Sequence, residues 1–160
     1  MKIIQWLQLL ASIVFCLFVG GLLGSLFTTP SIPTWYATLI KPPIQPPNWL
    51  FGPVWTILYI MMGIAAFMVW DSKGNKDIKR TALILFGIQL ALNVLWSPIF
   101  FTLHWLFAAF VVIVFLWTFI LLTMIQFNKI SRPAAVLLAP YLLWVSFASV
   151  LNLWIWLLNR

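Results

Sequence analysis

The sequence has 160 residues, of which 64% are hydrophobic and only 7% are charged. A chain this apolar cannot build a water-soluble surface, so the composition excludes a soluble globular protein and indicates an integral membrane protein. The formal net charge of +7 does not indicate a nucleic-acid partner. The cations lie between apolar runs, where they set the orientation of the chain in a membrane.

Five apolar runs are each long enough to cross a bilayer. A helix rises about 1.5 Å per residue, so about 20 residues are needed to span about 30 Å of hydrocarbon. The first run is too long for a signal peptide and lacks an obvious small-residue cleavage site, so we interpret it as a span. We predict an all-α membrane protein with one domain over residues 1–160, a five-transmembrane-helix bundle with spans near 4–27, 51–70, 79–101, 105–127 and 133–158.

The segment between the first two spans, residues 28–50, is rich in proline. Seven of the ten prolines fall in residues 30–53, and four of these come as two pairs, Pro42–Pro43 and Pro46–Pro47. Proline fixes φ and pushes the preceding residue toward extended geometry. We therefore predict a stiff, non-helical lid, bracketed by Trp35, Tyr36 and Trp49.

The distribution of Lys and Arg predicts the orientation. With five spans, the N-terminus shares one side with loops 71–80 and 128–132, and that side carries seven cations. The opposite side carries only Lys41 and Arg160. Since positive loops stay inside, we predict an N-terminus inside and a lid and C-terminus outside, and we expect the membrane to be a bacterial cell membrane.

Large rings that carry a polar atom recur at helical spacing. Trp55 and Tyr59 are four residues apart and share one helix face. In the fifth span Pro140 lies well inside the run and predicts a kink. A single face of that span carries Pro140, Tyr141, Trp144, Phe147, Ala148 and Leu151, with Asn152 at its edge.

The third span has two distinguishable faces. At 100° per residue Gln89, Asn93 and Trp96 fall within about 60° of one another, whereas Gly87 and Ala91 lie on the opposite side. A polar stripe facing the bundle and a small-residue stripe facing another helix is the simplest interpretation. We predict a homodimer through Gly87 and Ala91.

The sequence offers no pattern for catalysis or metal binding. Apart from Lys79 and Arg80 at the very start of the third span, no charged residue lies in a predicted span, which disfavours a proton-coupled transporter. There is one cysteine, Cys16, and one histidine, His104, so neither an intrachain disulfide nor a Cys/His metal cluster is expected. The aromatic rings and amides instead favour a site for a large, flat, mostly apolar ligand, with a purely structural membrane protein as the alternative.

Four segments, in order along the chain, resemble the TspO/MBR family of bacterial tryptophan-rich sensory proteins and mitochondrial translocator protein, or peripheral benzodiazepine receptor. They are W-Y-A-T-L-I-K-P-P, P-P-N-W-L-F-G-P-V-W-T-I-L-Y, Q-L-A-L-N-V-L-W-S-P-I-F-F and P-Y-L-L-W-V-S-F-A-S-V-L-N. The resemblance implies a five-helix bundle, commonly a homodimer, that requires no cofactor. It also implies porphyrins and related tetrapyrroles and benzodiazepine-type compounds as ligands and, in some members, cholesterol.

The resemblance further implies where a ligand would bind. The family's pocket maps onto Ser25, Thr28, Trp49, Trp55, Asn93, Trp96, Trp144, Ala148 and Leu151. The helix faces described above add Tyr59 and Phe147. The C-terminal cholesterol motif lacks its central tyrosine, because Leu153 and Trp154 stand in that region, and this departure weakens the expectation of cholesterol binding.

Three functions share this pocket. The leading hypothesis is a membrane receptor or translocator-like protein that binds tetrapyrroles. The second is a light- or oxygen-dependent porphyrin-degrading enzyme, because some bacterial members are associated with protoporphyrin breakdown attributed to tryptophans that match Trp55 and Trp144. The third is a passive facilitator of lipid, sterol or porphyrin transport. Membrane lipid, a tetrapyrrole and a second copy of the chain are the expected partners.

Overall fold

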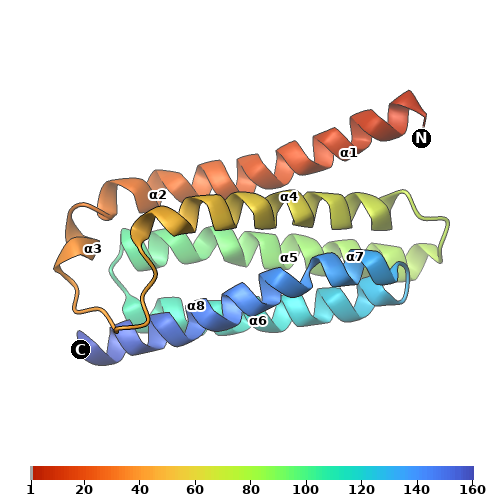
Figure 1. Ribbon diagram of the computed structural model, residues 1–160. Coiled ribbons are helices and arrows are strands. Elements are labelled where there is room, and N and C mark those ends of the chain that lie inside the picture. The colour runs from red at the N-terminus through yellow and green to blue at the C-terminus, as the bar shows by residue number, and fades with distance from the viewer. Residues whose placement is uncertain (1) are drawn as a thin grey trace.

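The computed structural model describes residues 2–160, and these residues form helices and no strand. The elements in order are α1 (Ile3–Cys16), η1 (Leu17–Leu22), α2 (Leu23–Ser31), α3 (Trp35–Thr38), η2 (Asn48–Leu50), α4 (Phe51–Trp70), α5 (Lys76–Phe101), α6 (Leu106–Asn128), α7 (Arg132–Leu137) and α8 (Ala139–Leu158). The long helices run side by side as a bundle, with α3 at one end and the α4–α5 turn at the other (Figure 1).

Five helical segments within these residues are long and apolar enough to cross a membrane. They are Ile3–Ser31, Asn48–Trp70, Lys76–Phe101, Leu106–Asn128 and Arg132–Leu158. The predicted all-α bundle of five membrane helices is therefore confirmed. The orientation of the termini stays a prediction.

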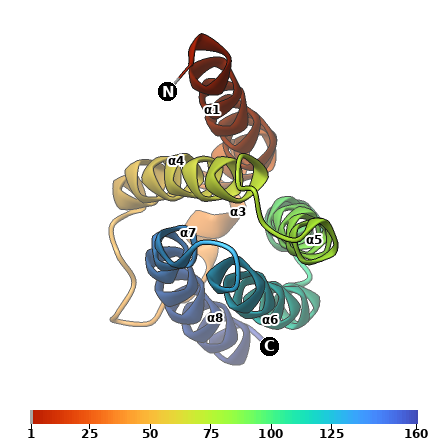
Figure 2. The same cartoon turned by 90° about the vertical axis from the view of Figure 1, so that its right-hand side faces the viewer.

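The first membrane helix changes its winding midway. Residues 17–22 form a π-helical segment that includes Gly20 and Gly21, and such segments recur at functional sites. A side chain at Gly20 would overlap the ring of Tyr59 on α4, so only glycine allows this close approach. The N-terminal end of α1 leans away from the bundle (Figures 1 and 2).

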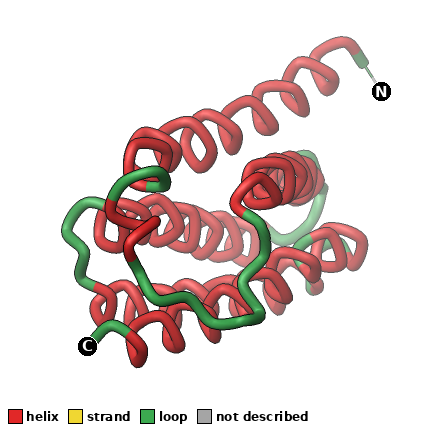
Figure 3. The backbone as a smooth tube through the Cα atoms, turned by 60° about the vertical axis from the view of Figure 1, so that its left-hand side comes forward, coloured by secondary structure: helices red, strands yellow, loops and turns green. Residues whose placement is uncertain are grey.

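The segment predicted as a non-helical lid is partly helical, and that part of the prediction was wrong. Residues 28–31 continue α2 despite Pro30, while α3 and η2 form short helices. Tyr36 accounts for α3, because its ring is 5% exposed and packs against Phe100 and Phe101. Only residues 39–47 form the extended loop that proline favours (Figure 3). Whether this loop acts as a lid stays a prediction.

The fifth membrane segment has a one-residue break at Leu138, two residues before Pro140, where the sequence predicted a kink. Helix α7 ends at Leu137 and α8 begins at Ala139, so Pro140 lies in the first turn of α8. A proline in a first turn costs little, because its missing N–H would have had no partner there. The Leu142 N–H donates a hydrogen bond to the Leu138 carbonyl, so helical hydrogen bonding resumes directly after the break.

The third membrane helix, α5, presents its two faces as predicted. Gln89 and Asn93 are buried in the bundle, and Trp96 is half-buried. Gly87 and Ala91 are exposed, and no atom lies within 4 Å of a side chain built at Gly87. The small-residue face is thus open to a partner, and the homodimer stays a prediction.

Candidate ligand-binding site

A cavity of about 620 Å³ lies among α2, α4, α5 and α8, at the end of the bundle that α3 covers. Its volume is within the roughly 300–1,000 Å³ of pockets that hold drug-sized ligands. Ten of the eleven residues predicted for the site line it: Ser25, Thr28, Trp49, Trp55, Tyr59, Asn93, Trp96, Trp144, Ala148 and Leu151. Phe147 does not line the cavity and lies beside Trp144, with ring centroids 5.6 Å apart.

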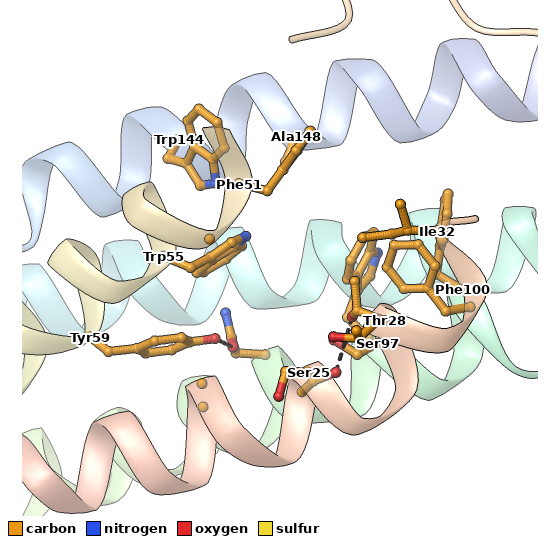
Figure 4. A pocket seen from close by; sticks show the side chains of 18 of the residues that line it. Ser25, Thr28, Ile32, Phe51, Trp55, Tyr59, Ser97, Phe100, Trp144 and Ala148 are labelled. Carbon is orange, nitrogen blue, oxygen red and sulfur yellow. Dashed lines mark hydrogen bonds between the residues drawn. The ribbon is translucent and has the colours of Figure 1, made fainter. Parts of the chain in front are cut away.

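Aromatic rings from α4 and α8 form one side of the cavity. Trp55 stacks on Tyr59 at 5.5 Å between ring centroids and meets Tyr141 edge-on at 6.1 Å. Phe51, one helical turn before Trp55, meets Trp144 edge-on at 5.8 Å. Figure 4 shows Trp55 between Trp144 and Tyr59. These rings hold one another in place and present flat surfaces for stacking.

The polar groups at the base of the cavity are paired with one another. The Tyr59 hydroxyl donates to Asn93 Oδ1 at 2.6 Å, and Asn93 Nδ2 donates to the Tyr141 hydroxyl at 3.0 Å. All three side chains are buried. This chain of hydrogen bonds joins α4, α5 and α8, so it fixes the base of the cavity.

The indole N–H of Trp96 is also hydrogen-bonded within the protein. Its indole N–H donates to Asn152 Oδ1 at 3.0 Å, and Asn152 Nδ2 donates to the Leu106 carbonyl at 3.0 Å. The Trp96 ring stacks on Phe100 with centroids 4.9 Å apart. Trp96 can therefore offer a ligand its ring, while its polar atom positions α8 against α5.

Trp144 differs from Trp96 in one respect. Its indole Nε1 is buried and has no hydrogen-bond partner, although Trp144 lines the cavity. A buried donor without an acceptor costs roughly 1–3 kcal/mol. Trp144 thus lines the cavity with a flat ring, and its indole N–H is a buried donor without an acceptor.

Two hydroxyl groups on the α2 side of the cavity, those of Ser25 and Thr28, donate hydrogen bonds to backbone carbonyls of their own helix. Ser25 Oγ donates to the Leu22 carbonyl at 2.8 Å, and Thr28 Oγ1 donates to the Gly24 carbonyl at 3.0 Å. Their oxygens remain available as acceptors. Ser25 and Thr28 can therefore each accept a hydrogen bond from a ligand, but their own hydroxyl protons are already donated within the helix.

Tyr36 of α3 and Asn48 and Trp49 of η2 line the cavity, and the 39–47 loop connects these two short helices. Trp49 is 71% exposed. Lys41 Nζ lies 4.8 Å above the centroid of the Tyr36 ring, and burial raises the pKa of the Tyr36 phenol above 10.0. This phenol is therefore neutral at physiological pH and keeps its proton as a donor.

The loop is tied to the end of α8 by Asn159. Its Oδ1 accepts from the Ile40 N–H at 2.9 Å, and its Nδ2 donates to the Ile40 carbonyl at 2.9 Å and to the Ile155 carbonyl at 2.8 Å. We call this set of bonds the Asn159 clasp. Sequence reasoning missed it, because no local pattern relates two positions 119 residues apart.

Some lining residues could have been found from spacing. Phe51 precedes Trp55 by four residues, and Ser97 follows Asn93 by four, so each shares a helix face with a predicted site residue. Ile32 and Tyr36 could not, because they reach the cavity only through the turn after α2. Within residues 2–160 no cluster of His, Cys, Asp or Glu could hold a metal ion.

Comparison with known proteins identifies relatives along nearly the whole chain. The model of the TspO/MBR family matches residues 12–157. The chain is 50% identical over 155 residues to tryptophan-rich protein TspO of Chlorobaculum tepidum, covering 97% of this chain and 98% of that protein. It is 45% identical over 153 residues to tryptophan-rich protein TspO of Archaeoglobus fulgidus, with 96% and 97% covered.

The similarity extends to eukaryotic proteins. Translocator protein of Homo sapiens is 38% identical over 139 residues, covering 86% of this chain and 82% of that protein. Residues 12–157, which the family model matches, contain all four sequence segments quoted above and every residue that lines the cavity. This multi-pass membrane protein belongs to the TspO/MBR family.

Proposed function

We propose that the protein is a membrane receptor that binds a tetrapyrrole in the aromatic cavity. The observation that carries the proposal is that Trp144 lines a cavity of flat rings while its buried indole N–H has no acceptor within the protein. A ligand that stacks on these rings and accepts one hydrogen bond would complete the site.

The character of the lining supports a large, flat and mostly apolar ligand. Trp55, Trp96 and Trp144 present rings, while the donors of Tyr59, Asn93 and Trp96 are spent on other side chains. No Lys, Arg, Asp or Glu lines the cavity, so binding would rest on stacking and apolar contact. A porphyrin macrocycle fits this description better than a sugar, a nucleotide or an ion.

The position of the cavity is consistent with a ligand that partitions into membranes. Ser25 on α2 and Thr56 on α4 both line it and are exposed, so the cavity is accessible from outside the bundle core. Relatives bear the names translocator protein and tryptophan-rich sensory protein. Those names fit a protein that binds a small molecule, although they name no ligand.

Titration of protoporphyrin IX into detergent-solubilised protein in darkness tests the proposal. We expect saturable quenching of tryptophan fluorescence and a shift of the porphyrin absorption band. Trp144→Phe and Trp55→Phe should each weaken binding by roughly threefold to tenfold, equivalent to about 0.7–1.4 kcal/mol. Trp154→Phe is the matched control, because Trp154 does not line the cavity.

Two outcomes would overturn the proposal. The first is the absence of saturable binding to the folded protein, and the second is an equal affinity for the Trp144, Trp55 and Trp154 variants. Illumination of the bound complex separates the competing functions. New absorption bands beyond those of free porphyrin, lost in Trp55→Phe or Trp144→Phe, would favour the porphyrin-degrading enzyme, whereas a stable bound spectrum would favour the receptor.

A further inference from the structure

A second hollow is lined by the end of α4 and the beginning of α5. These two helix ends lie at the end of the bundle opposite α3 (Figure 1). The hollow has a volume of about 590 Å³ and is lined by Trp70, Lys76, Lys79, Arg80, Leu83 and Ile84. We call it the basic groove. Neither the four family-like segments nor the proposed tetrapyrrole site includes any of these residues.

The basic groove concentrates positive charge. Three of its six lining residues are cations, whereas charged residues make up only 7% of the chain. Neither Asp71 nor Asp77, the two acidic residues of the sequence, lines it. The Asp71 carboxylate instead accepts a hydrogen bond from Gln5 Nε2 at 2.9 Å. The groove is therefore electrostatically complementary to an anion.

The three cations are not equivalent. Lys79 Nζ donates to the Trp70 carbonyl at 2.8 Å and to the Ser72 carbonyl at 3.0 Å, so it caps the C-terminal end of α4. Lys76 and Arg80 are exposed and lie four residues apart, on one face of the first turns of α5. These two side chains are placed to hold one anionic group, and the N-terminal end of the helix adds to the positive potential.

The rest of the groove is apolar. Ile84 is 52% exposed and follows Arg80 by four residues, which is about 6 Å along a helix. Trp70 is 59% exposed and ends a membrane helix, where tryptophan commonly lies at the lipid headgroups. A free phosphate ion would make no favourable contact with these apolar side chains. A phospholipid has both a phosphate for the cations and an acyl chain that can cover the apolar side chains.

We propose that the basic groove binds an anionic phospholipid. Arg80 and Lys76 hold the phosphate, which carries the net negative charge of the headgroup, and the first part of an acyl chain lies along Leu83 and Ile84. Trp70 covers the junction between the headgroup and the chain. Basic pockets beside membrane helices recognise anionic headgroups in this way. The proposal does not depend on the tetrapyrrole site.

Native mass spectrometry of the delipidated full-length protein, with added phosphatidylglycerol or phosphatidylcholine, tests this proposal. We expect tighter binding of one phosphatidylglycerol than of phosphatidylcholine. The variant Lys76→Gln/Arg80→Gln should weaken binding of phosphatidylglycerol by roughly tenfold. The variant Lys129→Gln/Arg132→Gln removes the same charge at the same end of the bundle, outside the groove, and should change binding by less than about twofold.

Three results would overturn the proposal. They are equal affinity for the two lipids, an equal loss of binding in both double variants, and displacement of phosphatidylglycerol by an equal concentration of inorganic phosphate. The last result would mean that the groove recognises an anion without its chain. The single variant Arg80→Gln and the thermal midpoint of each variant guard against misfolding, because a folded variant that retains full affinity also contradicts the proposal.

Discussion

The two ends of the bundle differ in how closely the helices approach one another. Toward the α4–α5 turn, α4 buries Met62, Gly63, Ala65 and Ala66, and Gly63 lies directly against the backbone of α1 at Ile13. Toward α3, the same helix carries Phe51 and Trp55, and the helices stand apart around a cavity of about 620 Å³. The second half of α4 therefore packs closely against α1, and we call this part the closed end. The first half borders the cavity, and we call it the open end.

Side-chain size and hydrogen bonding explain this difference. In a bilayer, apolar surface gains little by leaving lipid for another helix, so close packing and hydrogen bonds decide where helices meet. Glycine and alanine allow backbones to touch at the closed end. At the open end large rings keep the backbones apart, and the hydrogen bonds among Tyr59, Asn93 and Tyr141 hold that spacing.

The closed end gives the largest expected effect on stability. A side chain at Gly63 would lie 2.5 Å from Ile13 Cα and 2.9 Å from Ile13 N. Because backbone atoms cannot move aside without separating α1 from α4, Gly63→Ala should lower the free energy of unfolding by roughly 1–3 kcal/mol. Thermal denaturation in detergent, followed by tryptophan fluorescence, measures this change. Gly87→Ala is the control, and an equal midpoint for both variants would show that α1 and α4 do not need the close approach.

The base of the open end should be the next most sensitive place. Asn93→Leu keeps the side-chain volume but removes the acceptor of Tyr59 and the donor to Tyr141. Leaving buried polar groups unpaired costs roughly 1–3 kcal/mol. We expect a lower thermal midpoint than for Asn128→Leu, which changes an exposed amide at the end of α6. A midpoint no lower than that of the control would mean that ring packing alone sets the spacing.

Loss of the Asn159 clasp should change the rate at which the 39–47 loop opens more than it changes the free energy of unfolding. Asn159→Ala removes both bonds to Ile40, but these groups are near the surface and water can replace Asn159. Each such bond contributes about 0.5–1.5 kcal/mol, so we expect limited proteolysis within residues 39–47 to accelerate several-fold. If the proposed ligand binds, stopped-flow measurement should also show faster dissociation. Unchanged proteolysis, relative to Asn128→Ala, would exclude a clasp.

The outer face of α5 should have the smallest effect on the cavity. Gly87→Leu/Ala91→Leu places bulk on an exposed face that does not line the cavity. We expect the protein to sediment as a monomer, with protoporphyrin affinity within about twofold of the original, because the substitutions act only between copies. Val111→Leu, on an exposed face of α6, is the control. A double variant that remains dimeric would place the interface on another helix.

Some features of this protein follow from the sequence by itself. Five runs of apolar residues determine five membrane helices, because no other structure satisfies the backbone of so long an apolar run in lipid. Spacing along one helix determines that Trp55 and Tyr59 share a face and that Gly87 and Ala91 oppose Asn93, since these relations depend only on helical geometry. The order of the four family-like segments is likewise a property of the sequence.

Other features were decided only by the tertiary structure. Tyr36 turns part of the proline-rich segment into α3 because Phe100 and Phe101, more than sixty residues away, bury its ring. Trp96 and Trp144 look alike in sequence, yet Asn152 accepts from Trp96 while nothing accepts from Trp144. Exposure and hydrogen-bond partners depend on which helices are neighbours, and helical periodicity carries no information about neighbours distant in the chain.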